Sequence, residues 1–215
     1  MFITFEGTEG SGKTTQVNLT MQYLRDKGHD VLLTREPGGT LVGDSIREIL
    51  LNKDTVQLSP RAELLLFNAS RAQLVDQVLR PHLEAGGVVL CDRYVDSSVA
   101  YQGYGHGLDV QDVIHAVNIA TGGLMPDVTI FLDLTPEEGL KRRAESSLFG
   151  EEFNRIDAMS IAFHQRVYQG YIDIGRAEPR RWVRIDAAQS PEQVQRDIVA
   201  ALEKRFKAHK KRKKA

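Results

Sequence analysis

This sequence has little cysteine and no long apolar run. Cys91 is the only cysteine among 215 residues, so a disulfide within the chain is excluded. It follows the apolar residues 88–90, and we expect its thiol to fill space in the core. No apolar run approaches the roughly 20 residues that cross a bilayer. Residues 1–5 show no basic segment of a secretion signal. These absences predict a protein of the reducing cytoplasm with no membrane partner.

Acidic residues are missing from the C-terminal end. Residues 204–215 carry eight Lys or Arg and no Asp or Glu. The whole chain has a formal net charge of −1, so the rest of it carries −9. Such a basic run can bind nucleic acid, but a terminal charge run is more often a solvated, frayed helix end. We therefore assign 207–215 to a basic tail and keep nucleic-acid binding as the less favoured alternative.

Five short apolar runs alternate with helical patterns along the chain. Hydrophobic residues make up 41% and charged residues 27%, which is typical of one packed domain at this length. Strands that are apolar throughout and alternate with helices indicate a parallel sheet covered on both faces. We predict an α/β fold with a three-layer, doubly wound sheet in a single domain over residues 1–206. The predicted strands are Phe2–Phe5, Val31–Thr34, Val88–Cys91, Val128–Leu132 and Trp182–Ile185.

Several helix ends can be predicted from local chemistry. Ser59, Thr135 and Ser190 each stand before a proline, which is typical of a hydroxyl N-cap followed by proline at the first helical position. Gly28 and Gly122 are typical of helix stops.

Polar residues follow four of the predicted strands. Gly7, Arg35, Asp92 and Asp133 each come directly after, or soon after, an apolar run. The carboxyl ends of parallel strands are where doubly wound folds bind ligands. We therefore expect the four motifs to converge on one cleft.

A phosphate-binding loop follows the first strand, because residues 7–14 match G-x4-G-K-[ST]. In such a loop the backbone N–H groups surround phosphate, Lys13 reaches the β- and γ-phosphates and Thr14 offers a hydroxyl to Mg²⁺. The motif indicates a nucleoside triphosphate, but GTPases, ATPases and kinases all use it. The candidate nucleotide-binding residues are Gly7, Thr8, Glu9, Gly10, Ser11, Gly12, Lys13, Thr14 and Thr15.

Two further segments suit a nucleoside. Phe67 and Arg71 are i, i+4 neighbours, and an aromatic ring beside a guanidinium can stack on a flat base and donate to its carbonyl edge. Core packing is the alternative for Phe67. If residues 94–102 are helical, one face carries the following polar and aromatic side chains: Tyr94, Ser98, Tyr101 and Gln102.

Positive charge follows the second strand. Residues 34–40 form a polar, glycine-rich turn that contains Arg35. Together with Arg47 in the next helix, this turn supplies cations where a monophosphate would lie. A solvated surface position is an equal alternative for Arg47.

Four segments together resemble bacterial thymidylate kinases over nearly the whole chain: residues 5–15, 34–40, 69–73 and 92–103. The resemblance implies a P-loop kinase fold with a small lid, the substrates ATP and dTMP, the cofactor Mg²⁺ and a homodimer. A kinase of dUMP or dCMP, or a P-loop regulatory NTPase, remains the alternative.

The resemblance also implies roles by position. Phe67 would stack on thymine, Arg71 would bond its O4, and Tyr101 would crowd the place of a ribose 2′-OH. Ser98 and Gln102 would also contact the base, and Glu9 would lie near the 3′-OH. The arginines implied around the acceptor phosphate are Arg35, Arg47 and Arg93.

An anionic acceptor needs no general base. We therefore expect catalysis by positioning and charge neutralisation, with Lys13, Arg93, Mg²⁺ and mobile arginines. Asp92 would hold the Mg²⁺ shell through water beside Thr14, although an acid at a strand end can also simply cap a turn.

The predicted lid covers about 142–155. In the bacterial type, Gly stands at the position of Gly10 where other types have Arg, and the lid supplies the missing cation. Residues 145–152 depart from the family because they contain no arginine. The remaining candidates for transfer are Arg142, Arg143 and Arg155, of which Arg155 has a structural ion pair as its alternative.

Overall fold

A computed structural model describes residues 1–52, 58–147 and 154–212. Its centre is a five-stranded parallel sheet in the order β2-β3-β1-β4-β5, which confirms the predicted fold class. Each strand ends one residue later than predicted, on a charged residue that still pairs in the ladder. The strands are β1 Phe2–Glu6, β2 Val31–Arg35, β3 Val88–Asp92, β4 Val128–Asp133 and β5 Trp182–Asp186.

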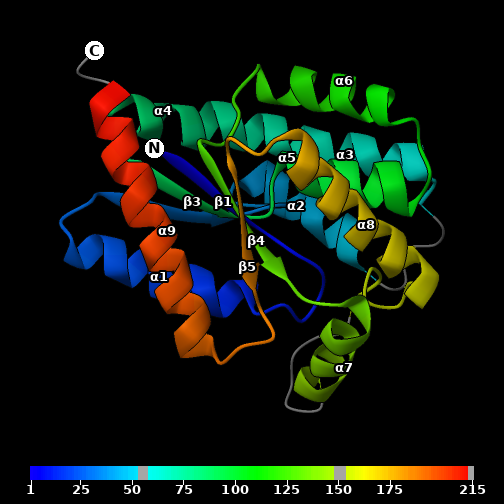
Figure 1. Ribbon diagram of the computed structural model, residues 1–215. Helices are drawn as coiled ribbons and strands as arrows, with labels where there is room; N and C mark the ends of the chain where they lie inside the picture. The colour runs from blue at the N-terminus through cyan, green and yellow to red at the C-terminus, as the bar shows by residue number, and fades with distance from the viewer. Residues whose placement is uncertain (53–57, 148–153, 213–215) are drawn as a thin grey trace.

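Helices cover both faces of this sheet and make the outer two layers (Figure 1). Two of them continue into π-helical turns, named η1 and η2. The helical elements are α1 Lys13–Asp26, α2 Leu41–Leu51, α3 Pro60–Leu74, η1 Val75–Leu79, α4 Arg80–Glu84, α5 Val95–Ser98, η2 Val99–Gly105, α6 Val110–Thr121, α7 Pro136–Ser147, α8 Ile161–Ala177 and α9 Pro191–Arg212.

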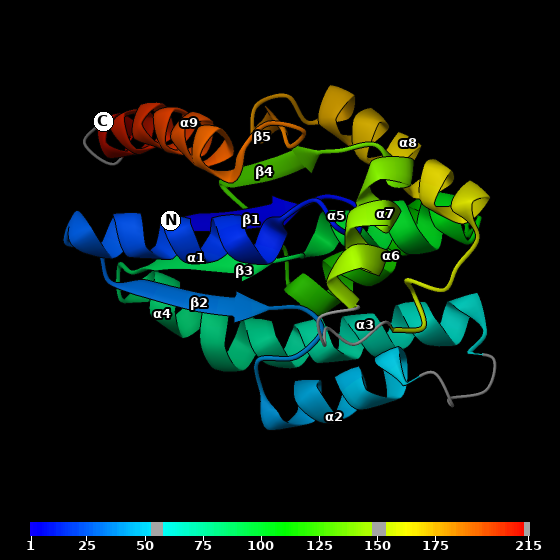
Figure 2. The ribbon, with the colours of Figure 1, turned by 90° about the horizontal axis from the view of Figure 1, so that it is seen from below.

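The strands divide their apolar side chains between the two faces. Ile3 and Phe5 pack with Leu24 of α1 and Ile198 of α9, whereas Phe2 points to the opposite face, toward α3 and α6. All of these side chains are buried, and each such burial contributes roughly 1.5–3 kcal/mol. Figure 2 shows the strands stacked edge to edge, with α2 lying outside α3. The two cores hold the strand ends in fixed positions.

The predicted caps are present. The N–H groups of Ala62, Glu138 and Gln193 lie 3.3, 3.4 and 3.3 Å from the hydroxyl oxygens of the capping residues Ser59, Thr135 and Ser190. Gly28 and Gly122 follow their helices with φ of 81° and 52°, in the left-handed region that glycine favours.

Two helices reach into the segments that were predicted as tail and lid. α9 runs without interruption to Arg212, so residues 207–212 continue a helix and no break separates them from the domain. α7 extends to Ser147, within the range of about 142–155 predicted for the lid. Residues 148–153 of the predicted lid and 213–215 of the predicted tail lie outside the described residues. Within the described ranges, no helix is both long and apolar enough to cross a membrane.

Candidate active site

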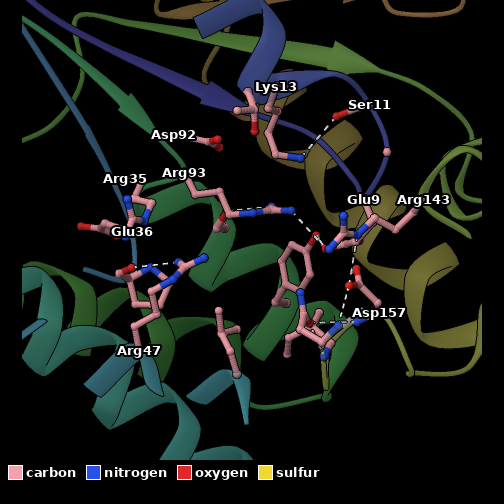
Figure 3. A pocket seen from close by; sticks show the side chains of 18 of the residues that line it. Glu9, Ser11, Lys13, Arg35, Glu36, Arg47, Asp92, Arg93, Arg143 and Asp157 are labelled. Atoms are coloured by element: carbon pink, nitrogen blue, oxygen red, sulfur yellow. Dashed lines mark hydrogen bonds and ion pairs between the residues drawn. The ribbon is translucent and has the colours of Figure 1, made fainter. Parts of the chain in front are cut away.

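A cavity of about 470 Å³ opens at the carboxyl ends of β1, β2 and β3. This volume lies in the usual range of ligand sites. Figure 3 shows Arg35 and Arg47 on one side of it, Arg143 on the other and Arg93 between them. The predicted site residues that line the cavity are Glu9, Gly10, Ser11, Gly12, Lys13, Thr14, Thr15, Arg35, Arg47, Phe67, Asp92, Arg93, Ser98, Tyr101, Gln102, Arg142 and Arg143.

Asp133 does not line the cavity. The expectation that four strand ends converge on one cleft was therefore wrong for the end of β4. Its carboxylate accepts hydrogen bonds from the Tyr168 hydroxyl (2.9 Å) and the Arg184 Nε–H (2.6 Å). The reason is topological, because β4 lies on the opposite side of β1 from β3 and pairs with β5. The cavity therefore forms on the β3 side of β1, where β1, β3 and β2 end.

The phosphate-binding loop joins β1 to α1. Lys13 is buried, and its ammonium group donates to the carbonyl oxygens of Gly7 (3.0 Å) and Thr8 (2.8 Å). Burial, together with the nearby Arg93, lowers the pKa of Lys13 to about 8. Gly12 has φ 85° directly before the helix, which turns the backbone into α1. Lys13 is thus held within the loop, at the start of α1.

Gly10 touches the backbone of α7, which leads into the predicted lid and is called the lid helix below. A Cβ on Gly10 would lie 2.0 Å from the carbonyl oxygen of Gly139 in α7, and a Cβ on Gly139 would lie 2.2 Å from the carbonyl oxygen of Glu9. Real Cβ atoms essentially never come this close, so neither position accepts a side chain without movement of α7. The contact seats α7 on the loop, one turn before Arg142 and Arg143.

Arg93 forms the centre of a hydrogen-bonded group. Its guanidinium donates to the Gly7 carbonyl (3.0 Å), the Tyr171 hydroxyl (3.2 Å) and the Glu9 carboxylate (3.0 Å). The Tyr101 hydroxyl also donates to Glu9, at 2.6 Å. Arg93 has φ 67°, a conformation that is unusual outside glycine and is concentrated at functional sites. The backbone and the side-chain contacts thus fix this cation between the loop and the cavity.

Glu9 remains ionised in this environment. Burial raises the pKa of its carboxyl, but contacts with His164, Arg93 and Lys13 outweigh burial and hold the pKa well below its ordinary value. His164 on α8 lies 3.2 Å from Glu9 through Nδ1 and is buried. Sequence patterns could not place this histidine, because it lies more than 150 residues away along the chain.

A second buried carboxylate, Glu6, supports Arg93 from behind. Glu6 accepts hydrogen bonds from the hydroxyls of Ser97 (2.6 Å) and Tyr171 (2.9 Å), and both hydroxyls contact Arg93. Burial, together with the charge of Asp96, raises the pKa of Glu6 to about 7. Sequence analysis missed this group. The only local signal was an acid at the end of an otherwise apolar strand.

The helical segment after β3 differs from its prediction. Tyr94 is fully buried, with its ring edge-on to Phe2 at 4.8 Å and its hydroxyl donating to the Leu124 carbonyl. The shared face that we expected for it was wrong, because Tyr94 precedes the first helical residue and its backbone is not helical. Residues 99–105 then form a π-helical turn rather than an α-helix.

Only one member of the predicted base-binding pair, Phe67 and Arg71, lines the cavity. Phe67 is half-buried and lines the cavity, whereas Arg71 is fully buried behind it. All five N–H groups of Arg71 donate to protein oxygens. The acceptors are the Glu36 carboxylate, the Asn68 side-chain carbonyl, the Ser98 hydroxyl and the Tyr94 backbone carbonyl. A direct contact of Arg71 with a base stays a prediction.

The turn after β2 carries two arginines. Arg35 is exposed and lies 3.8 Å from Asp44. Arg47 is half-buried and donates to the Pro37 carbonyl at 3.0 Å, which fixes it against the turn. Both line the same side of the cavity.

The three lid arginines have different surroundings. Arg142 contacts Glu138 (3.2 Å) and the Ala187 carbonyl (3.1 Å), and Arg143 contacts Asp157 (3.2 Å). Arg142 and Arg143 line the cavity, but Arg155 does not. Its guanidinium pairs with Glu63 and donates to the Leu50 carbonyl, which favours the structural alternative for Arg155. Its part in transfer stays a prediction.

The parallel sheet, the glycine-rich phosphate loop and a cavity bordered by arginines define a P-loop nucleotide kinase. Comparisons with known proteins agree. The thymidylate kinase family profile matches residues 5–198, and the chain belongs to this family. It is therefore a nucleoside monophosphate kinase.

Named relatives support this membership. The chain is 48% identical to a thymidylate kinase of Roseiflexus sp. (strain RS-1), covering 94% of this chain and 93% of that protein. It is 49% identical to one from Desulfovibrio desulfuricans, with 94% and 95% covered. Among solved structures, thymidylate kinase from Ehrlichia chaffeensis matches with a TM-score of 0.75 at 34% identity, over 94% of this chain and 98% of that one.

Proposed function

We propose that the chain transfers the γ-phosphoryl group of ATP to dTMP, giving ADP and dTDP. The observation that carries this proposal is the layout of the cavity. It has a phosphate loop with Lys13 at one end, an aromatic plate at Phe67, and arginines between them. A triphosphate and a flat base with its own phosphate require this combination.

In the proposed mechanism, the acceptor phosphate is already anionic and attacks without a general base. Arg35, Arg47 and Arg93 offset its charge and hold it in line with the donor. Lys13 and an arginine from the lid offset the charge that develops on the transferred phosphoryl group. Protein side chains thus supply position and charge, while the nucleotides supply the reacting oxygens.

Mg²⁺ is the cofactor that we infer for this reaction. Thr14 and Asp92 would hold it, and in support both line the cavity with hard oxygen donors. Among the described residues, no cluster of three or more His, Cys, Asp or Glu is placed to hold a metal. That is compatible with Mg²⁺ bound mainly through phosphates and water. When bound, Mg²⁺ neutralises phosphate charge.

A coupled ADP-release assay tests the function directly. With ATP and Mg²⁺, the purified protein should release ADP rapidly with dTMP and more slowly with dUMP, dCMP, dGMP or AMP. ATP hydrolysis that is equally fast without any monophosphate would instead support the regulatory NTPase alternative. A higher kcat/KM for dCMP than for dTMP would reassign the substrate.

At the base site, we infer that Phe67 stacks on the pyrimidine and that Ser98 and Gln102 meet its polar edge. Arg71 lies within 2.9 Å of the Ser98 hydroxyl and so can act on the base through Ser98. A direct contact of Arg71 with a base carbonyl would need one of its present hydrogen bonds to be given up.

Tyr101 is proposed to exclude ribonucleotides. Its hydroxyl donates to Glu9 at 2.6 Å and its ring lies 4.9 Å from the Arg93 guanidinium, so both ends of the side chain are fixed. Tyr101→Ala should raise kcat/KM for ribo-TMP relative to dTMP by about tenfold, because it opens space at C2′. Tyr101→Phe keeps the ring and serves as the control, with a smaller shift. An unchanged ratio in both variants would locate the discrimination elsewhere.

We also infer a homodimer. In support, α3 packs between α2 and α6, and these helices expose apolar side chains. Leu41 on α2, Leu65 on α3 and Ile119 on α6 are 90%, 63% and 85% exposed. Exposed apolar side chains on neighbouring helices are a feature that a protein interface would bury. Sedimentation velocity measures the association state.

A further inference from the structure

A buried carboxylate lies behind the proposed base site and has no part in the mechanism above. Glu63 on α3 is fully buried, one helical turn before Phe67. It does not line the cavity. Its Oε1 accepts a hydrogen bond from the Gln102 side-chain amide at 2.8 Å and lies 3.1 Å from His106 Nε2. Its Oε2 pairs with Arg155. Glu63 therefore connects the cavity residue Gln102 to Arg155, at the end of the predicted lid.

The charge of Glu63 decides which end of the Gln102 amide faces it. Burial raises the pKa of Glu63, but hydrogen bonds from His106, Gln102 and Arg155 lower it to about 2. At neutral pH the group is a carboxylate, which can accept hydrogen bonds but cannot donate them. Gln102 must therefore turn its NH₂ group toward Glu63. The nitrogen and oxygen of an amide are normally hard to tell apart, but here the partner's charge fixes the assignment.

The orientation of this amide determines what the cavity offers a base. Because Glu63 holds the amide nitrogen of Gln102, the side-chain carbonyl oxygen of Gln102 is the atom left to accept a hydrogen bond. Among the described residues, no hydrogen bond to that oxygen occurs. Thymine and uracil carry a donor at N3, whereas cytosine carries an acceptor there. A carbonyl oxygen attracts the N3–H of thymine or uracil and repels the N3 acceptor of cytosine.

We propose that Glu63 is a positioning residue for pyrimidine selectivity, because it fixes the amide of Gln102 with the oxygen toward the base. Bases with N3–H are thereby favoured over cytosine. This inference rests on the proposed function, since it takes the base to lie beside Phe67 and Gln102. It makes no use of the 5-methyl group, so dTMP and dUMP are treated alike.

The test replaces Glu63 by a side chain that can both donate and accept. In Glu63→Gln, the amide of Gln102 is free to turn over and offer its NH₂ group to cytosine. Calorimetric Kd values and kcat/KM are measured for dTMP, dUMP and dCMP. The preference for dTMP over dCMP should fall by about tenfold, the scale of one hydrogen bond. The dTMP to dUMP ratio should stay within about twofold.

Arg155→Gln is the matched control, because it removes another partner of the same carboxylate and leaves the bond to Gln102 in place. It should keep the dTMP to dCMP preference within about twofold. If Glu63→Gln leaves Arg155 uncompensated and does not fold, the double variant E63Q/R155Q removes both charges and takes its place.

Two results would overturn the inference. One is an unchanged dTMP to dCMP preference in the folded Glu63 variant. The other is an equal loss of preference in Arg155→Gln, which would assign the effect to the lid segment. Failure of the proposed function can be distinguished from failure of this inference. In that case the unaltered protein binds ATP and dTMP but forms no dTDP. The Kd ratios still test Glu63 in that case.

Discussion

Replacing Arg143 by alanine is expected to lower kcat by at least about 10³-fold, within the range of 10³–10⁵ that arginine fingers contribute. Arg143 lines the cavity from α7, with 18% of its side chain exposed, and contacts Asp157 at 3.2 Å. Gly10 brings no cation to the phosphates, so a lid arginine must meet the charge of the transferred phosphoryl group. Because that charge exists mainly in the transition state, KM for ATP should change by less than about threefold.

Alanine variants of the other two lid arginines supply the comparison. Arg142 is held by Glu138 and the Ala187 carbonyl and should rank second in its effect on kcat. Arg155 is directed to Glu63 and should affect stability more than transfer. The measurement is kcat at saturating ATP and dTMP. Retention of kcat within about tenfold, or ~1.4 kcal/mol, in all three variants would contradict the lid-arginine mechanism.

Replacing Arg93 by methionine should lower kcat/KM for dTMP by about 10²–10³-fold, or roughly 2.7–4 kcal/mol. This cation contacts Gly7, Tyr171 and Glu9 at 3.0–3.2 Å, so it links the phosphate loop to the acceptor side. Methionine keeps much of the volume and removes the charge. Steady-state kinetics with dTMP varied at saturating ATP give the change.

Arg93→Lys is the control for charge alone. Lysine keeps the cation but loses the planar fork that reaches several acceptors at once, so it should recover only part of the activity. Thermal unfolding of both variants separates the catalytic loss from the cost of leaving Glu9 buried with fewer partners. If folded Arg93→Met retains kcat/KM within tenfold, Arg93 has no part in holding the acceptor phosphate for transfer.

Much of the fold could be predicted from local sequence because its signals are local. The strands are continuous apolar runs, and the proline-flanked caps satisfy helix N-termini within three residues. The phosphate loop joins its strand and helix within a few residues. Arg35 and Asp92 were found by the rule that strand ends meet at one edge of a sheet. Asp133 shows the limit of that rule, since strand order decides which ends are neighbours.

The remaining site contacts join distant parts of the chain. Glu6 is supported by Tyr171, and Glu63 by Arg155, through contacts between residues 165 and 92 positions apart. Spacing in the sequence carries no signal for such pairs. Tyr94 was misplaced for a different reason. A face drawn with α-helical periodicity does not apply here, because Tyr94 has a non-helical backbone and a π-helical turn follows α5.

The backbone contact between Gly10 and Gly139 makes two ways of supplying a cation mutually exclusive. An arginine at position 10 would need the space that α7 fills, and α7 is the element that presents Arg142 and Arg143 to the cavity. Adding a cation to the loop would therefore displace those of the lid rather than increase the positive charge. In this fold, the residue at position 10 and the path of the lid helix can change only together.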